Sequence, residues 1–346
     1  MSYRPTYTPT AGKTTMNLFT TIPGAIALAI LALPAMAEAE FKLKMQSYYP
    51  SAMLNAETTF AETINRESDG RIEIQTFSGG ELVPTSQILN AVRTGTIDLG
   101  RGIGQLFTET PIGAIEAGMP MAWTSVEEAN RVFFDLGLRD IVAEEYSKHG
   151  VNYLGPVWAA PYHFLSKRPI KSIEDMRSMK IRAVGASAKM LAEVGVQTVS
   201  MPPEDIYLAL TTGQIDGVLY GSAFEYKETK YYEGGRFFNT TPVLDPITDA
   251  LVINPDVWNS LPADLQTIVQ NAADEMRSGY YDWITERDAE AIQELFKNTS
   301  TSFSEEDMRI MTEAAVKVWE EEAKRSPANA KAVEIIMENA KAAGRL

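Results

Sequence analysis

Short strand-like and helix-like segments alternate twice along this 346-residue chain, and this alternation restricts its fold more than any other feature. In the first half, the strand-like segments alternate apolar and polar residues, and the segments between them repeat apolar residues at helical spacing. These segments are 41–45, 53–66, 71–77, 86–93 and 96–99. Strands and helices in this order predict a parallel sheet covered by helices, which is the α/β class.

The alternation returns in the middle of the chain. The expected strands are 151–154, 162–165, 180–183, 215–219 and 250–253, and the expected helices include 186–194 and 204–212. Residues 92–100 and 210–218 resemble each other, because both place a glycine-ended helix directly before a strand that opens with Ile-Asp. A chain of this length exceeds what one hydrophobic core usually supports, so two α/β halves are expected.

The stretch 262–297 keeps a helical pattern that is interrupted only at Gly279. At about 1.5 Å per residue, such a helix is about 50 Å long, which exceeds the diameter of one small domain. We therefore expect it to span both halves. Two further helices, at 305–325 and 328–343, complete the chain.

Residues 1–37 have the pattern of a secretory signal peptide. Arg4 and Lys13 precede an apolar run over 18–33, and the segment ends in Pro34-Ala35-Met36-Ala37 with no acidic residue before it. The apolar run is shorter than the roughly 20 residues that a membrane-spanning helix needs. We expect cleavage after Ala37 and export to the periplasm.

Composition excludes several classes of function. Without Arg4 and Lys13 of the leader, 29 basic residues face 46 acidic ones, a net charge of −17 that repels nucleic acid and anionic membranes. The chain has no Cys and only two His, so thiol chemistry, a metal site and a cofactor are not expected. The segment 100–104, Gly-Arg-Gly-Ile-Gly, lacks the GxGxxG spacing of a dinucleotide loop and is interpreted as a flexible loop.

Arg182 and a group of aromatic residues are the candidate ligand-binding side chains. Arg182 ends the expected strand 180–183, and ligands of open α/β sheets bind beyond the carboxyl ends of strands. A guanidinium there can hold a carboxylate or sulfonate through two hydrogen bonds, although an isolated Arg is also a common surface ion-pair partner. The aromatic residues near strand ends, each of which also suits the core, are Tyr48, Tyr49, Trp123, Trp158, Tyr162, Tyr220 and Phe224.

Four segments resemble the extracytoplasmic solute-binding proteins of TRAP transporters, the family that includes C4-dicarboxylate and sialic-acid receptors. They are 70–82 (GRIEIQTFSGGEL), 166–170 (SKRPI), 173–182 (IEDMRSMKIR) and 201–217 (MPPEDIYLALTTGQIDG). The resemblance covers nearly all of the chain after the leader. It implies two α/β lobes of the periplasmic-binding-protein type, with the ligand cleft between them and a long helix bracing both.

The resemblance also implies lobe boundaries and a ligand residue. Lobe I is expected at 38–159 plus 248–287, and lobe II at 160–247 plus 288–346. Arg182 stands where the family places the Arg that binds the ligand carboxylate.

The chain departs from the family pattern in ways that narrow the ligand. Tyr220 stands where the family often has an Asn, and Pro203 replaces a common aromatic residue. The second family Arg is absent, since Pro161-Tyr162-His163 occupies its stretch. With one Arg, a dicarboxylate or a sialic acid fits poorly, and a small monocarboxylate, a sulfonate or a zwitterion fits better.

The sequence therefore predicts a periplasmic receptor, monomeric and not an enzyme, that hands a small organic anion to the small and large membrane subunits of a TRAP transporter. The expected ligand-binding residues are Arg182, Tyr220, Trp158, Tyr162, Tyr48, Phe224 and His163. Two alternatives are a ligand-sensing module of a signalling system and an exported enzyme acting on a small acid. For the enzyme, Tyr162, His163 and Glu225 are acid–base candidates, but no nucleophile–base–orienter set is readable.

Overall fold

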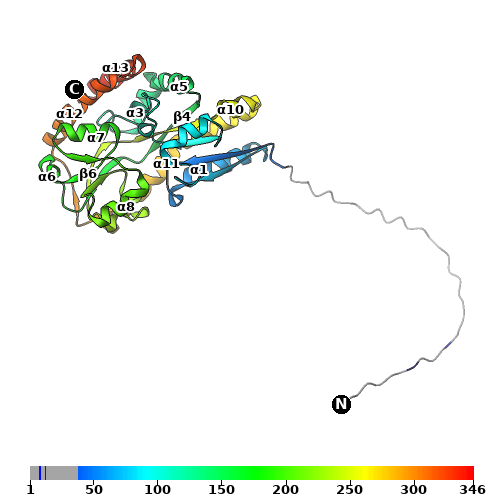
Figure 1. Ribbon diagram of the computed structural model, residues 1–346, viewed down its shortest axis with the longest axis horizontal. Coiled ribbons are helices and arrows are strands. Elements are labelled where there is room, and N and C mark those ends of the chain that lie inside the picture. The colour runs from blue at the N-terminus through cyan, green and yellow to red at the C-terminus, as the bar shows by residue number, and fades with distance from the viewer. Residues whose placement is uncertain (1–7, 9–11, 13–37) are drawn as a thin grey trace. The chain divides into compact units, whose positions relative to one another are not determined.

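The computed structural model describes Thr8, Gly12 and residues 38–346, and Glu38–Leu346 form one compact unit (Figure 1). The predicted signal peptide, 1–37, lies outside the described residues apart from the two named ones. Among the helices that the structure describes, none is both long and apolar enough to span a membrane.

Two mixed β-sheets confirm the expected α/β class. The first has the order β2-β1-β3-β10-β4, and β10 runs antiparallel to both of its neighbours. Its strands are β1 Phe41–Ser47, β2 Ile72–Phe77, β3 Leu99–Gly102, β4 Asn152–Ala159 and β10 Ile247–Ile253. The second has the order β11-β9-β5-β8-β6-β7. Its strands are β5 Tyr162–Ser166, β6 Lys180–Arg182, β7 Gln197–Val199, β8 Gly217–Leu219, β9 Phe237–Leu244 and β11 Ser300–Thr301.

Helices pack around both sheets. They are α1 Asn55–Glu67, α2 Ile88–Arg93, α3 Gly113–Glu116, α4 Val126–Asn130, α5 Leu138–Lys148, α6 Ile173–Arg177, α7 Gly185–Glu193, α8 Pro203–Thr212, α9 Ala223–Glu228, α10 Pro255–Ser260, α11 Ala263–Ala291, α12 Glu305–Ala323 and α13 Pro327–Ala342. Local signals explain several boundaries. Pro203 opens α8 and Gly213 ends it in the left-handed conformation, while Ser172 and Asp175 cap α6 reciprocally.

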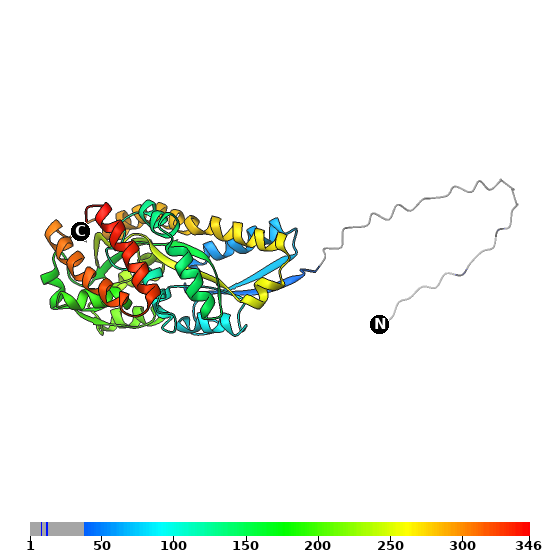
Figure 2. The same cartoon turned by 90° about the horizontal axis from the view of Figure 1, so that it is seen from above.

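The long C-terminal helix contacts elements on both sides of the molecule. α11 packs against β4, a strand of the first sheet, and against α1, which lies between β1 and β2 in the chain. It also packs against α9, which follows β8 of the second sheet (Figure 2). The long helix expected at 262–297 is confirmed, because Gly279 does not break α11, which continues into a π-helical turn at Ile292–Phe296. Further along, α12 packs on α7, whereas α13 contacts α3 and α5.

The segment expected as a flexible loop at 100–104 is instead mostly a buried central strand. β3 covers Leu99–Gly102, three residues later than the strand predicted at 96–99. All four residues of β3 are buried, so no apolar–polar alternation marks the strand in the sequence. Gly100 and Gly102 are required by close packing, because an added Cβ would lie 2.6 Å from Ile88 and 2.8 Å from Phe107.

The repeated helix-to-strand turn uses the same contacts in both halves. In the first, the Asp98 carboxylate accepts a hydrogen bond from Lys44 N at 2.7 Å, and Asp98 N donates to Lys44 O at 2.9 Å. In the second, Asp216 pairs with the backbone of Lys180 in the same way, at 2.9 and 2.8 Å. Asp98 therefore holds the start of β3 beside β1, and Asp216 holds the start of β8 beside β6.

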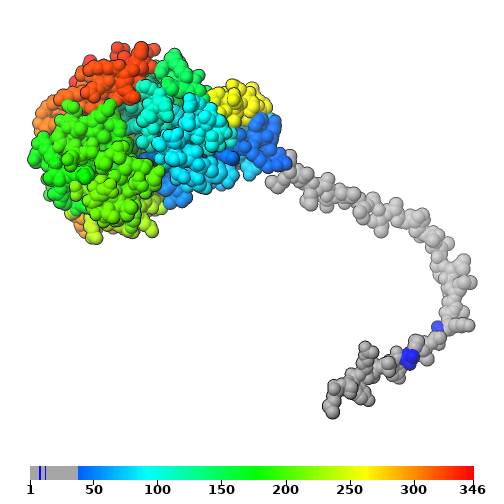
Figure 3. Space-filling model, in the orientation of Figure 1, coloured from blue at the N-terminus to red at the C-terminus, as the bar shows by residue number. Residues whose placement is uncertain are grey.

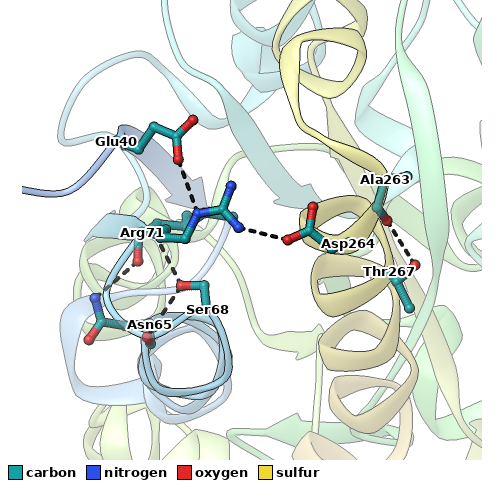
Figure 4. Close-up of polar contacts among 8 residues, drawn as sticks. Glu40, Asn65, Ser68, Arg71, Ala263, Asp264 and Thr267 are labelled. Carbon is teal, nitrogen blue, oxygen red and sulfur yellow. Dashed lines mark hydrogen bonds and ion pairs between the residues drawn. The ribbon is translucent and has the colours of Figure 1, made fainter.

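An exposed ion-pair cluster joins β1, β2 and the start of α11 (Figure 4). Arg71 donates to Glu40 at 3.0 Å and to Asp264 at 2.7 Å, and all three side chains are at least 38% exposed. Because solvent and salt screen such pairs, we expect Arg71→Ala to shift the urea midpoint of unfolding only slightly. A large drop in that midpoint, relative to the unchanged protein, would contradict this expectation.

Candidate functional site

A small cavity lies where strand ends of the two sheets face each other. Its lining residues are Tyr48, Tyr49, Ile103, Ala160, Tyr162, Tyr220, Glu225, Ile247 and Asp249. Tyr48 and Tyr220 directly follow β1 and β8, so the cavity occupies the position beyond the carboxyl ends of strands where α/β sheets bind ligands. Its volume of about 10 Å³ is close to the room that one water molecule needs.

A residue that follows β3 of the first sheet touches a residue that follows β6 of the second sheet near this cavity. Gly185, the first residue of α7, has a φ of +53°, and an added Cβ there would lie 1.9 Å from the Gln105 side-chain oxygen. Gln105 belongs to the short turn Gly104–Leu106 that follows β3. On the face shown in Figure 3, the green surface of residues near 190 meets the cyan surface of residues near 100. Gln105 lies two residues after Ile103, which lines the cavity, so this contact is close to the cavity in the chain.

Arg182 is fully buried at the end of β6 and is not a surface ion-pair partner. Its Nε and Nη2 both donate to Met201 O, at 3.1 and 2.9 Å, and its Nη1 donates to Leu219 O at 3.3 Å. A guanidinium has five N–H groups, so these three bonds leave two, and the Tyr48 hydroxyl lies within hydrogen-bonding reach of the guanidinium. Its carbon lies 5.7 Å from the centre of the Tyr220 ring. Burial raises the pKa of the neighbouring Tyr48 hydroxyl, and the charge of Arg182 opposes that rise.

A second buried arginine, which the sequence reasoning missed, lies beside the cavity. Arg101 of β3 donates to Glu57 at 2.9 Å and to Asp249 at 3.0 Å. Its guanidinium carbon lies 4.6 and 4.1 Å from the ring centres of Tyr49 and Tyr280, two rings that themselves contact each other at 5.1 Å. Burial alone would lower its pKa, but the two carboxylates hold the pKa above its ordinary value. The sequence signal that could have indicated this buried arginine is its position between Gly100 and Gly102.

Glu225 contributes a buried carboxyl group to the cavity wall. It is the third residue of α9, where its Oε2 accepts a hydrogen bond from Ser222 N at 3.0 Å and its Oε1 accepts one from Tyr280 at 3.3 Å. Burial raises its pKa to about 8, and the neighbouring charges of Asp288 and then Asp249 contribute to that rise. In the sequence, Glu225 was considered only as an acid–base group of the alternative enzyme.

Of the aromatic residues predicted for the site, Tyr48, Tyr162 and Tyr220 line the cavity, whereas Trp158 and Phe224 do not. Trp158 packs edge-on against Phe133 at 5.2 Å, and Phe224 packs edge-on against Trp283 at 5.1 Å. These two rings therefore serve as packing groups in this structure.

His163 also lies outside the cavity lining. Its Nδ1 is 3.0 Å from Asn239 O, which can only accept, so Nδ1 carries the proton. Burial lowers the pKa of His163 to about 4, and the ring is neutral at physiological pH. Within the part of the chain that the structure describes, no group of three or more His, Cys, Asp or Glu is arranged to hold a metal ion.

Comparison with known families identifies the class of protein. Residues 50–326 match the family described as bacterial extracellular solute-binding protein, family 7. The chain belongs to this family. The resemblance to TRAP receptors is thereby confirmed, and membership implies an extracytoplasmic, periplasmic location.

Individual family 7 relatives are similar over most of the chain. The monocarboxylate 2-oxoacid-binding periplasmic protein of Nostoc sp. is 25% identical, with 82% of this chain and 80% of that protein covered. The sialic acid-binding periplasmic protein of Vibrio cholerae is 24% identical over 86% and 93%. A TRAP periplasmic solute-binding protein of Chromohalobacter salexigens, solved with bound (S)-(+)-2-amino-1-propanol, has a TM-score of 0.80 and 26% identity over 86% and 95%. Family 7 receptors of this kind have two lobes, and the two separate β-sheets of this chain agree with that architecture.

Proposed function

We propose that this family 7 receptor captures a small organic anion (a monocarboxylate, a sulfonate or a zwitterion) and delivers it to the small and large membrane subunits of a TRAP transporter. Buried Arg182 carries this proposal. Two backbone carbonyls hold its guanidinium in place, neither of them neutralises its charge, and two N–H groups remain for a ligand. The receptor acts as a monomer, after export by its N-terminal leader.

Binding closes the cleft by hinge motion, without covalent chemistry. We assign lobe I to 38–159 plus 248–287 and lobe II to 160–247 plus 288–346. Nearly all residues of the first sheet fall in lobe I and those of the second in lobe II, which supports this division. With this division, the contacts of α13 with α3 and α5 link the two lobes. A ligand that touches both lobes stabilises the closed arrangement.

The ligands of relatives are consistent with a small site. The Nostoc protein is named for monocarboxylate 2-oxoacids, and the Chromohalobacter protein holds an amino alcohol. The solute-binding family and the ligand held by the Chromohalobacter protein support binding, rather than turnover, as the activity that we propose.

A thermal-shift screen of small acids tests this function. A ligand that binds only the folded protein at 100 times its Kd adds about 2.7 kcal/mol to the free energy of unfolding, so the melting temperature rises. We expect one or more small carboxylates, sulfonates or zwitterions to raise it and to be recovered unchanged. If every acid left the melting temperature unchanged, or if a bound acid were converted to a product, the proposed function would be wrong.

A further inference from the structure

We propose that Glu225 and Asp249 bind an ammonium group of the ligand, so that the receptor selects a zwitterion over a plain organic acid. The inference rests on the proposed function and narrows it. The ligand then has one ammonium group within a few atoms of a carboxylate or sulfonate, which the two remaining N–H groups of Arg182 hold.

The first support is an excess of negative charge beside the cavity. Glu57 and Asp249 share one guanidinium, that of Arg101, so this fully buried trio carries a net charge of −1. Glu225 has no Lys or Arg partner among the described residues and accepts hydrogen bonds only from Ser222 N and Tyr280. A buried negative charge is costly unless a cation or a proton compensates it.

The second support is a set of polar atoms that lack partners. Asp249 Oδ1 and the Tyr220 hydroxyl have no hydrogen-bond partner within the described part of the chain, although both residues are at least 97% buried and line the cavity. The Tyr49 hydroxyl is the near neighbour of the Asp249 carboxylate. An ammonium group brings three N–H donors and no acceptor, which matches these oxygens. A cavity of about 10 Å³ also suits a group the size of water or –NH3+.

The third support is the aromatic wall. Tyr48, Tyr49 and Tyr220 line the same cavity as the two carboxyl groups, and aromatic rings attract a cation through their faces. Burial keeps a proton on Glu225 near neutral pH, with a pKa of about 8, and the ligand's ammonium would take that proton's place. A plain carboxylate in this position would bring no N–H donor to these oxygens and would lie near the carboxyl group of Asp249.

A zwitterion also carries one charged group for the positive part of the proposed site and one for the negative part. The positive group is Arg182, which does not itself line the cavity but neighbours Tyr48 and Tyr220 of the lining, and the negative group is the pair Glu225 and Asp249. Because a zwitterion has no net charge, the formal charge of −15 on the chain does not repel it as it repels an anion.

Isothermal titration with matched ligand pairs tests this inference on the purified protein. Each pair differs only in an ammonium or a hydroxyl group, such as taurine and isethionate, alanine and lactate, or β-alanine and 3-hydroxypropionate. We expect the zwitterion of at least one pair to bind roughly 10- to 100-fold more tightly than its partner, the range of one or two charge-assisted hydrogen bonds.

Glu225→Gln separates recognition from folding. Glutamine at the third position of a helix can still accept from Ser222 N, so the cap of α9 is retained while the charge is lost. We expect this variant to lose most of the preference for the zwitterion. Glu228→Gln is the matched control, because Glu228 is an exposed residue of the same helix that lies outside the cavity lining, and it should keep the preference.

The outcomes distinguish the two proposals. If hydroxy acids bind as well as their zwitterionic partners in every pair, the ammonium inference is wrong and the anion receptor stands. If no acid binds, with or without an ammonium group, both proposals fail. Because the paired comparison uses the unchanged protein, it decides the inference even if Glu225→Gln does not fold.

Discussion

Arg182→Ala is expected to weaken ligand binding by about 100-fold or more. The substitution removes the only buried guanidinium among the described residues that backbone carbonyls orient and no carboxylate neutralises. Hydrogen bonds to charged groups contribute roughly 1.5–3 kcal/mol each, so losing two of them accounts for this factor. Isothermal titration with a ligand found in the screen measures the effect.

One further variant and one further measurement control for indirect effects of this change. Lys180→Ala removes an exposed cation two residues earlier on β6 and should leave affinity unchanged. Arg182→Ala also leaves Met201 O and Leu219 O without these donors, so circular dichroism must show that the fold persists. Wild-type affinity in a folded Arg182→Ala protein would show that the ligand anchor lies elsewhere.

Arg101→Met is expected to lower the free energy of unfolding by about 3–5 kcal/mol, since it leaves two buried carboxylates without their cation. Glu57 and Asp249 are at most 1% exposed, so solvent cannot compensate them. A urea titration measures the loss. The cationic side chain of Arg101→Lys should retain part of the stability, but it cannot reproduce both contacts of the planar guanidinium.

A triple variant separates charge from packing. Glu57→Gln, Arg101→Met and Asp249→Asn together remove the whole charged trio, so the triple variant should be more stable than Arg101→Met alone. Equal stability of the single and triple variants would mean that the lost packing of the Arg101 side chain against the rings of Tyr49 and Tyr280, rather than unpaired charge, causes the destabilisation.

The electrostatic surroundings of the two arginines explain why we propose only Arg182 as the ligand anchor. Arg101 already has two carboxylate partners, whereas Arg182 has only uncharged carbonyl partners. In a closed cleft of low dielectric, the charge of Arg182 acts strongly at short range. Screening limits the opposing field of the acidic surface to about 8–10 Å in physiological salt. An acidic receptor can therefore hold a ligand carboxylate at this point.

Much of the fold could be predicted because its signals are local. The alternation in β1 and β2, the reciprocal cap of α6 and the Gly213 stop of α8 each depend on residues close together in the chain. The limits of prediction appear at β3, where burial on both faces removes the alternating pattern. The sequence pattern therefore predicts this strand three residues too early and places Arg101 in a loop.

By itself, the sequence determined the α/β class, the turn shared by the two halves, the family resemblance and the position of Arg182 at a strand end. Only the tertiary structure decided which side chains share the cavity. Arg101 meets partners 44 and 148 residues away, and the cavity joins Tyr48 to Glu225 and Asp249. Burial and charge pairing arise from such distant contacts, because removing water from both sides of a side chain requires segments that are far apart in the chain.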